Sequence, residues 1–124
     1  MVLEVLNFGL TVCKLNMEAD LRTDSGFFFL LRTDEEISLV CRPEDVPAET
    51  IAREDGWRAF RIQGPLDFSL VGILAKISGV LAKSRISIFA VSTYNTDYVL
   101  IKEEHFDRAL TLLSENGFEI ERLP

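Results

Sequence analysis

The alternation of apolar and polar residues changes its period several times along this chain. Period two predicts strands, and spacings of three and four predict amphipathic helices. Over the second half of the sequence these periods predict six elements in turn. They are a strand at 57–63, a helix from about residue 70, strands at 86–94 and 98–102, a helix from about residue 104, and a strand at 118–122.

The residues at the ends of these elements support this order. Gly64 and Pro65 interrupt the first strand, and Asn116-Gly117 is a typical helix stop. Asp67 and Ser69 are two possible N-caps for the first helix. The resulting order is β-α-β-β-α-β, the ferredoxin-like arrangement with two helices on one face of an antiparallel sheet. We therefore predict an α+β fold.

The first half of the chain is rich in strand patterns and poor in helix patterns. Alternation predicts strands at about 8–15, at 27–32 and at 36–42, and the four-residue turn between the last two suits a hairpin. Pro43 favours one short helical turn after the last of these strands. The polar, acidic stretch 48–56 is the predicted boundary, which gives two units at 1–56 and 57–124.

The first predicted helix has two unlike faces. Its apolar stripe is expected to face the core, and its other side carries only small residues. The stripe consists of Leu70, Ile73, Leu74, Ile77, Val80 and Leu81, and the small side of Gly72, Ala75, Ser78, Gly79 and Ala82. Each glycine inside a helix costs about 1 kcal/mol relative to alanine, so close approach of a ligand or backbone is one interpretation. A merely thin, exposed face is the alternative.

Composition and charge exclude several classes of protein. The chain has 124 residues and a net charge of −7, all of which belongs to residues 1–56. An acidic chain without a basic stripe argues against nucleic acid as a partner. The apolar runs fall far short of a membrane span, and no signal peptide is recognisable, so we expect a cytoplasmic protein with no membrane partner.

Candidate chemistry is sparse. Cys13, Cys41 and His105 are too few and too scattered for a metal site, and no cofactor motif is present. An acylphosphatase-like reaction needs an arginine in the first loop, and PLDFSLVG has none. His105 has Glu103 and Glu104 beside it but no evident nucleophile. We therefore predict no catalytic residues, no metal and no enzymatic activity.

Two segments resemble a known family. The stretch IQGPLDFSLVGILAKISGVLAKSRISIFAVST is similar to the ACT domain, in which a strand enters a loop of the Asp-x-x-Gly kind, followed by a helix and a strand. The segment VSTYNTDYVLI resembles the hairpin of the CASTOR arginine sensors and of short bacterial tandem-ACT proteins. RTDEEISLVC and GWRAFRIQG extend the likeness to the bacterial proteins over nearly the whole chain.

The resemblance implies a non-catalytic regulatory protein that binds a free amino acid at an interface between ACT units. It implies a reduced ACT-like unit at 1–56 followed by a complete ACT domain at 57–124. The implied ligand-binding residues lie on a loop and on a hairpin. They are Asp67, Ser69, Leu70, Val71 and Gly72 on the loop, and Thr93, Tyr94, Thr96 and Asp97 on the hairpin.

Local chemistry is compatible with this site and also with simpler roles. A helix start offers free N–H groups to a carboxylate, and Asp97 can pair with an ammonium or guanidinium group. Asp97 can equally be a turn former, Asp67 a plain cap, and Thr93 and Tyr94 ordinary strand residues.

The second half is predicted to leave one face of its sheet bare, with Ile88 or Phe89 exposed. We therefore expect the two halves to pack together and the chain to form a homodimer. A protein partner regulated by the ligand is a further expectation. The alternative function is a pure interaction and dimerisation module that binds no ligand.

Overall fold

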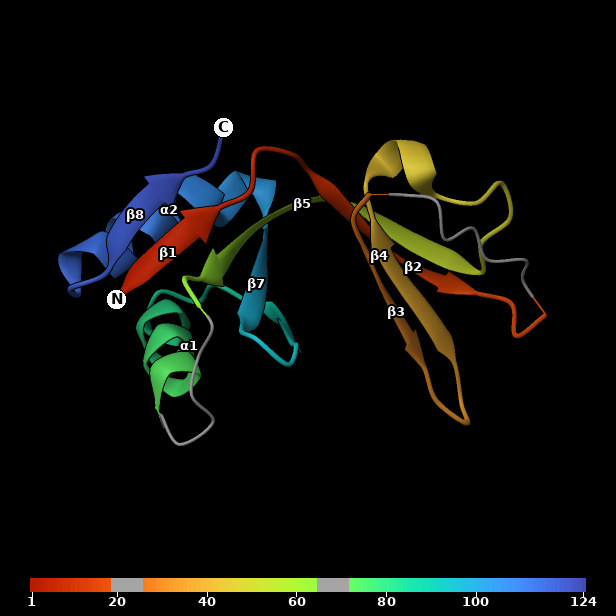
Figure 1. The fold of residues 1–124 in the computed structure, drawn as a ribbon, viewed down its shortest axis with the longest axis horizontal. Helices are drawn as coiled ribbons and strands as arrows, with labels where there is room; N and C mark the ends of the chain where they lie inside the picture. The colour runs from red at the N-terminus through yellow and green to blue at the C-terminus, as the bar shows by residue number, and fades with distance from the viewer. Residues whose placement is uncertain (19–25, 65–71) are drawn as a thin grey trace. The chain divides into compact units, whose positions relative to one another are not determined.

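A computed structural model describes residues 1–18, 26–64 and 72–124 of the chain. Within these ranges the chain forms two compact units (Figure 1). Residues 8–57 form one, which we call the β unit, and residues 1–7 and 58–124 form the other, which we call the α+β unit. Strand β5 (Ala52–Ile62) contributes its first part to the β unit and the rest to the α+β unit.

The β unit is an antiparallel sheet in the order β3-β4-β2-β5. Its other elements are β2 (Leu10–Leu15), β3 (Phe28–Arg32), β4 (Ile37–Cys41) and the 3₁₀ turn η1 (Pro43–Asp45). One face holds a small core, against which Phe28 and Val46 pack. The members of this core are Cys13, Leu15, Ile37, Leu39 and Cys41.

The α+β unit has a five-stranded sheet in the order β6-β7-β5-β1-β8. Both helices cover one face, since a single buried cluster joins them to alternate residues of the strands. Ile77 and Leu81 come from one helix, and Phe106, Leu110 and Leu113 from the other. The elements are β1 (Val2–Val5), α1 (Ile73–Lys83), β6 (Phe89–Ser92), β7 (Asp97–Lys102), α2 (Glu103–Glu115) and β8 (Glu119–Arg122).

The predicted β-α-β-β-α-β order is confirmed as β5-α1-β6-β7-α2-β8, and the α+β class with it. The predicted helical stop is also present, since Gly117 has φ 95° after α2. Gly117 N–H donates to Ser114 O and Phe118 N–H to Leu113 O, which satisfies the last carbonyls of the helix. The predicted hairpin between β3 and β4 and the helical turn after Pro43 are present too.

The N-terminal strand β1 was absent from the sequence prediction, which placed a single strand at about 8–15. In the structure Val2–Val5 lies between β5 and β8, antiparallel to the first and parallel to the second. Residues 1–7, which the predicted division assigned to the first unit, therefore group with residues 58–124. The insertion adds Leu3 and Val5 to the core under the helices.

Part of the segment 48–56, the predicted boundary, is strand. Strand β5 begins at Ala52 and continues without interruption through Gly56, at φ 81°, to Ile62. Residues 52–56 of this stretch are the exposed start of strand β5. The strand predicted at 86–94 is shorter in the structure, where β6 covers Phe89–Ser92.

The two units share a strand order. Numbered along the chain, the four strands β2 to β5 of the β unit lie in the order 2-3-1-4. Strands β5 to β8 of the α+β unit lie in the same order, with β1 inserted before the last. In the β unit, η1 lies at the chain position of α2, between the third and fourth strands. The described strands of the β unit thus follow the strand order of the α+β unit, with a 3₁₀ turn at the chain position of α2.

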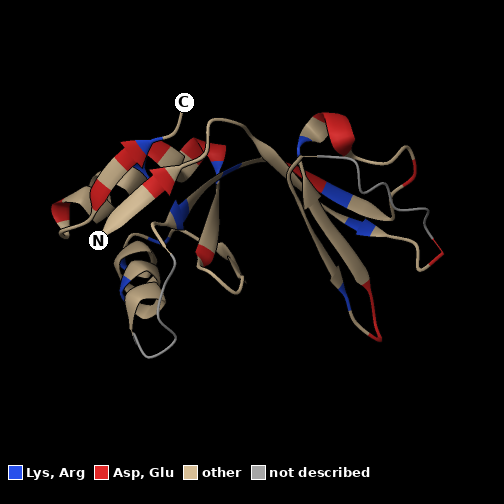
Figure 2. Cartoon of the chain, in the orientation of Figure 1, with Lys and Arg blue, Asp and Glu red and all other residues tan. Residues whose placement is uncertain are grey.

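Charge divides unequally between the two units. The β unit has 5 Lys and Arg against 11 Asp and Glu, whereas the α+β unit has 8 against 9. Figure 2 shows acidic residues at the turn between β3 and β4. The acidic excess predicted for the first half therefore belongs to the β unit.

Candidate functional site

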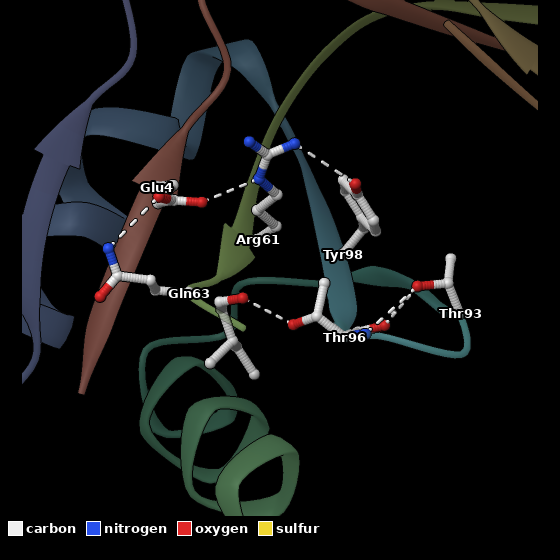
Figure 3. A network of polar contacts seen from close by, with 7 residues as sticks. Glu4, Arg61, Gln63, Thr93, Thr96 and Tyr98 are labelled. Carbon is white, nitrogen blue, oxygen red and sulfur yellow. Dashed lines mark hydrogen bonds and ion pairs between the residues drawn. The ribbon is translucent and has the colours of Figure 1, made fainter. Parts of the chain in front are cut away.

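The hairpin between β6 and β7 ends in a tight turn closed by Thr93. Its N–H donates to Thr96 O at 2.8 Å, and its hydroxyl donates to the same oxygen at 2.9 Å. Thr96 N–H in turn approaches Thr93 Oγ1 at 3.3 Å (Figure 3). Three contacts between two residues fix the course of the turn, which leaves Tyr94 at its tip with 83% of its surface exposed.

Thr96 also joins this turn to the neighbouring strand. Its hydroxyl donates to Ile62 O, the last residue of β5, at 2.6 Å, and only 8% of Thr96 is exposed. β7 pairs with β5, so the start of one strand lies beside the end of the other. β5 leads along the chain to α1, and Figure 1 shows the start of α1 and the hairpin tip at the same end of the unit.

The first turn of α1 differs from the prediction. The helix begins at Ile73 and not near residue 70, and Gly72 occupies the N-cap position in the left-handed region with φ 85°. Gly72 has no side chain with which to cap the helix. α1 has no acidic residue in its first turn, whereas α2 has Glu103 and Glu104 there. The positive end of the α1 dipole is therefore not neutralised by the helix's own side chains.

The predicted site residues fall into three groups. Asp67, Ser69, Leu70 and Val71 lie outside the described residues. Thr93, Tyr94, Thr96 and Asp97 lie together on the hairpin, with Asp97 half-buried as the first residue of β7. Gly72 is exposed at the start of α1.

A polar network that sequence reasoning missed crosses the sheet beside this hairpin. Arg61 Nε donates to Glu4 Oε1 at 2.9 Å, and its Nη1 lies 3.4 Å from the Tyr98 hydroxyl (Figure 3). The hydrogen bond to Glu4, and secondly the one to Tyr98, raise the pKa of Arg61 above its usual value. The guanidinium therefore stays charged. Nothing in the sequence indicated Glu4 as the partner of Arg61.

This network lies on the sheet face that was predicted to be bare. The face opposite the helices carries Glu4, Arg61 and Tyr98 across three adjacent strands. Ile88, one of the two residues expected on the bare face, packs instead against the core on the helix side. The face is therefore partly polar.

The small-residue side of α1 is open within the described chain. Ala75, Gly79 and Ala82 are exposed, and a Cβ built at Gly79 meets no heavy atom within 4 Å. No described element of this chain packs there.

No group of three His, Cys, Asp or Glu side chains in the described parts of the chain is placed to hold a metal ion. None of the described helices has the length and apolar character needed to cross a bilayer.

The two thiols lie buried in the β unit. Burial raises the pKa of the Cys13 thiol. The pKa of the Cys41 thiol is raised to about 11, mainly by burial and secondly by the neighbouring Cys13. Because an unfolded thiol ionises near 9.0, ionisation favours the unfolded chain from that pH upward. We expect the β unit to lose stability as the pH rises from about 9 to about 11. Urea unfolding of wild type and Cys41→Ala at pH 8 and pH 10 checks this, since the variant should lose less stability.

A sequence model of the ACT domain matches residues 52–115, just over half of the chain. Among curated proteins, the cytosolic arginine sensor for mTORC1 subunit 1 of Homo sapiens is 41% identical over 58 residues. That match covers 46% of this chain and 18% of the sensor. The sensor of Rattus norvegicus is 40% identical over 58 residues, with the same coverage. The match thus spans less than a fifth of the length of these relatives.

Solved structures resemble the whole chain. A crystal structure of a protein from Agrobacterium tumefaciens has a TM-score of 0.87 and 28% identity, covering 99% of this chain and 93% of that one. A Vibrio cholerae protein of unknown function has a TM-score of 0.70 at 20% identity, covering 90% and 85%. Clostridium acetobutylicum aspartate kinase has a TM-score of 0.63 at 15% identity, covering 86% and 32%. The last two likenesses concern the fold alone.

Proposed function

The chain belongs to the ACT domain family, and from this membership we propose that it is a non-catalytic regulatory protein that binds a free amino acid. The curated relatives matched over 58 residues are named as arginine sensors. Amino-acid sensing is the function that these relatives and the hairpin geometry support together.

The hairpin is the observation that carries this proposal. Thr93, Thr96 and Asp97 are held in a fixed turn at the end of β5, the strand that precedes the α1 start. A free amino acid presents a carboxylate and an ammonium group a few ångströms apart. The start of α1 at Gly72, a helix whose first turn has no acidic residue, suits the carboxylate, and Asp97 suits the ammonium or a cationic side chain.

The loop residues complete the proposed site. Asp67, Ser69, Leu70 and Val71 precede Gly72 and connect β5 to α1. They lie outside the described residues, and their place in the site follows from the resemblance to the family. Thr93 and Tyr94 would form the opposite wall, with Tyr94 as an exposed aromatic surface.

We place the ligand at an interface between ACT units, as the family suggests. The shared 2-3-1-4 strand order supports the interpretation of the β unit as a reduced ACT-like unit. A homodimer and a cytoplasmic location accompany this proposal, and a protein partner would respond to the bound amino acid. The open small-residue side of α1 favours a second candidate, an interaction module that binds no ligand.

Thermal shift measurements with the twenty amino acids distinguish these candidates. A ligand that binds only the folded chain stabilises it by about 2.7 kcal/mol at a hundred times its dissociation constant. We expect one or a few amino acids to raise the melting temperature by several degrees and the others to leave it unchanged.

The matched control is the methyl ester of each active amino acid, which lacks the carboxylate charge. The ester should give no shift if the carboxylate is bound at the start of α1. An unchanged melting temperature with all twenty amino acids would reject the sensor and favour the interaction module.

A further inference from the structure

We propose that Thr96 is a positioning residue of the amino-acid site and not a ligand contact. This inference rests on the proposed function and deepens it, because it assigns different roles to residues of one hairpin. Thr96 holds the hairpin against the end of β5, so that Asp97 and the turn closed by Thr93 stay in place for a ligand.

The hydroxyl of Thr96 is already committed inside the protein. Thr96 is 8% exposed, and its only hydroxyl proton is donated to Ile62 O at 2.6 Å. A hydroxyl has one proton to give, so Thr96 has none left for a ligand carboxylate. The acceptor, Ile62 O, belongs to the last residue of β5.

The same residue also closes the turn. Thr96 O accepts from Thr93 N–H at 2.8 Å and from the Thr93 hydroxyl at 2.9 Å. Thr96 therefore joins the turn that carries Thr93 to β5, the strand that precedes α1 along the chain. Loss of the Thr96 hydroxyl should release the turn from β5 while leaving the β6–β7 ladder intact.

The β unit contains the same turn without this bond. Between β3 and β4, Thr33 N–H donates to Glu36 O at 2.9 Å, and Thr33 Oγ1 accepts from Glu36 N–H at 3.1 Å. Thr33 and Glu36 correspond to Thr93 and Thr96, since each pair follows one strand and precedes the next. Glu36 is exposed and accepts from the Ser38 hydroxyl beside it. A Thr closing the turn is thus common to both hairpins, and the bond to the preceding strand belongs to the α+β unit.

Two substitutions in the full chain test the inference. Thr96→Val keeps the shape and removes the hydroxyl, and Thr96→Ser keeps the hydroxyl. For an amino acid identified by thermal shift, we expect Thr96→Val to weaken binding about tenfold in calorimetric titration, and Thr96→Ser to restore most of it. If Thr96→Val does not fold, Thr96→Cys, with a weak donor of similar size, should give an intermediate loss. Glu36→Val is the matched control at the equivalent turn and should leave affinity unchanged.

Amide hydrogen exchange without any ligand separates positioning from contact. In Thr96→Val we expect the Thr93 amide to exchange about tenfold faster than in wild type, while the equivalent Thr33 amide is unchanged. Weakened binding with an unchanged Thr93 amide would make Thr96 a ligand contact and overturn the inference. Unchanged binding in Thr96→Val would overturn it as well.

The hydrogen-exchange experiment also distinguishes failure of the proposed function. If wild type binds none of the twenty amino acids, the sensor proposal fails and the positioning role for a ligand fails with it. Faster exchange at Thr93 would still show that the bond to Ile62 holds the hairpin. Unchanged exchange would refute that structural link independently.

Discussion

Deletion of residues 1–6 should abolish cooperative folding of the α+β unit. β1 lies between β5 and β8, so its loss opens the sheet at an interior position. The deletion removes Leu3 and Val5 from the core, and the lost burial of each apolar side chain costs roughly 2 kcal/mol of folding free energy. The backbone bonds of β1 to both neighbours are lost as well, at about 1 kcal/mol each. The sum is comparable to the whole stability of a typical domain.

Circular dichroism reports this unit selectively, because both described α-helices belong to it. We expect the deletion variant to lose most of its helical signal at 222 nm and its cooperative melt. A milder pair tests the same point. Leu3→Ala should cost about 2–5 kcal/mol, whereas Met1→Ala, at a residue 50% exposed, should cost less than about 0.5 kcal/mol. A deletion variant with the wild-type melt would contradict the assignment of β1 to this core.

The elements of the second half were predictable because their periods are long and regular. The stripe of α2, with Phe106, Leu110 and Leu113, spans two turns and is followed by Gly117. Such a pattern needs no knowledge of the partner surface. Hairpin β3–β4 was predictable for a similar reason, since two apolar runs flank a short polar turn.

β1 was not predictable from local pattern. Its position depends on pairing with β5 and β8, and Leu3 aligns with Ile62 and Ile120, far along the chain. The Glu4–Arg61 ion pair follows from this register alone, since these two residues face each other across β1 and β5. Local propensity carries no information about such contacts.

The start of α1 illustrates a different limit. Asp67 and Ser69 are good N-caps by residue type, but the helix begins later, after Gly72 in a left-handed conformation. The sequence showed a glycine near the helix start without showing that its φ is positive. For the hairpin, sequence similarity indicated Thr93, Tyr94, Thr96 and Asp97 as a group. It did not show that Thr96 is bonded to Ile62, because that contact depends on the pairing of β5 with β7.

Replacement of Asp97 by alanine should abolish the amino-acid-induced thermal shift without unfolding the protein. Asp97 is half-buried at the first position of β7, opposite Ser92, and lies directly after the Thr93–Thr96 turn. It is the acidic residue of the hairpin and the proposed partner of a ligand cation. A charge-assisted hydrogen bond contributes about 1.5–3 kcal/mol, so its loss should weaken affinity by roughly ten- to a hundredfold. At the concentration that shifts wild type by several degrees, the variant should show almost no shift.

Two further variants identify which property of Asp97 matters. Asp97→Asn keeps the shape and removes the charge, so it should lose nearly as much affinity as Asp97→Ala if the ligand cation is recognised by charge. Asp107→Ala, on α2 with 93% of its side chain exposed, removes an equal charge from the same unit and should keep the wild-type shift. Near-equal melting temperatures of all three variants without ligand would show that the fold is intact. A wild-type shift in Asp97→Ala would eliminate this carboxylate as a ligand contact, and the ammonium partner would then have to be sought elsewhere in the chain or on a second ACT unit.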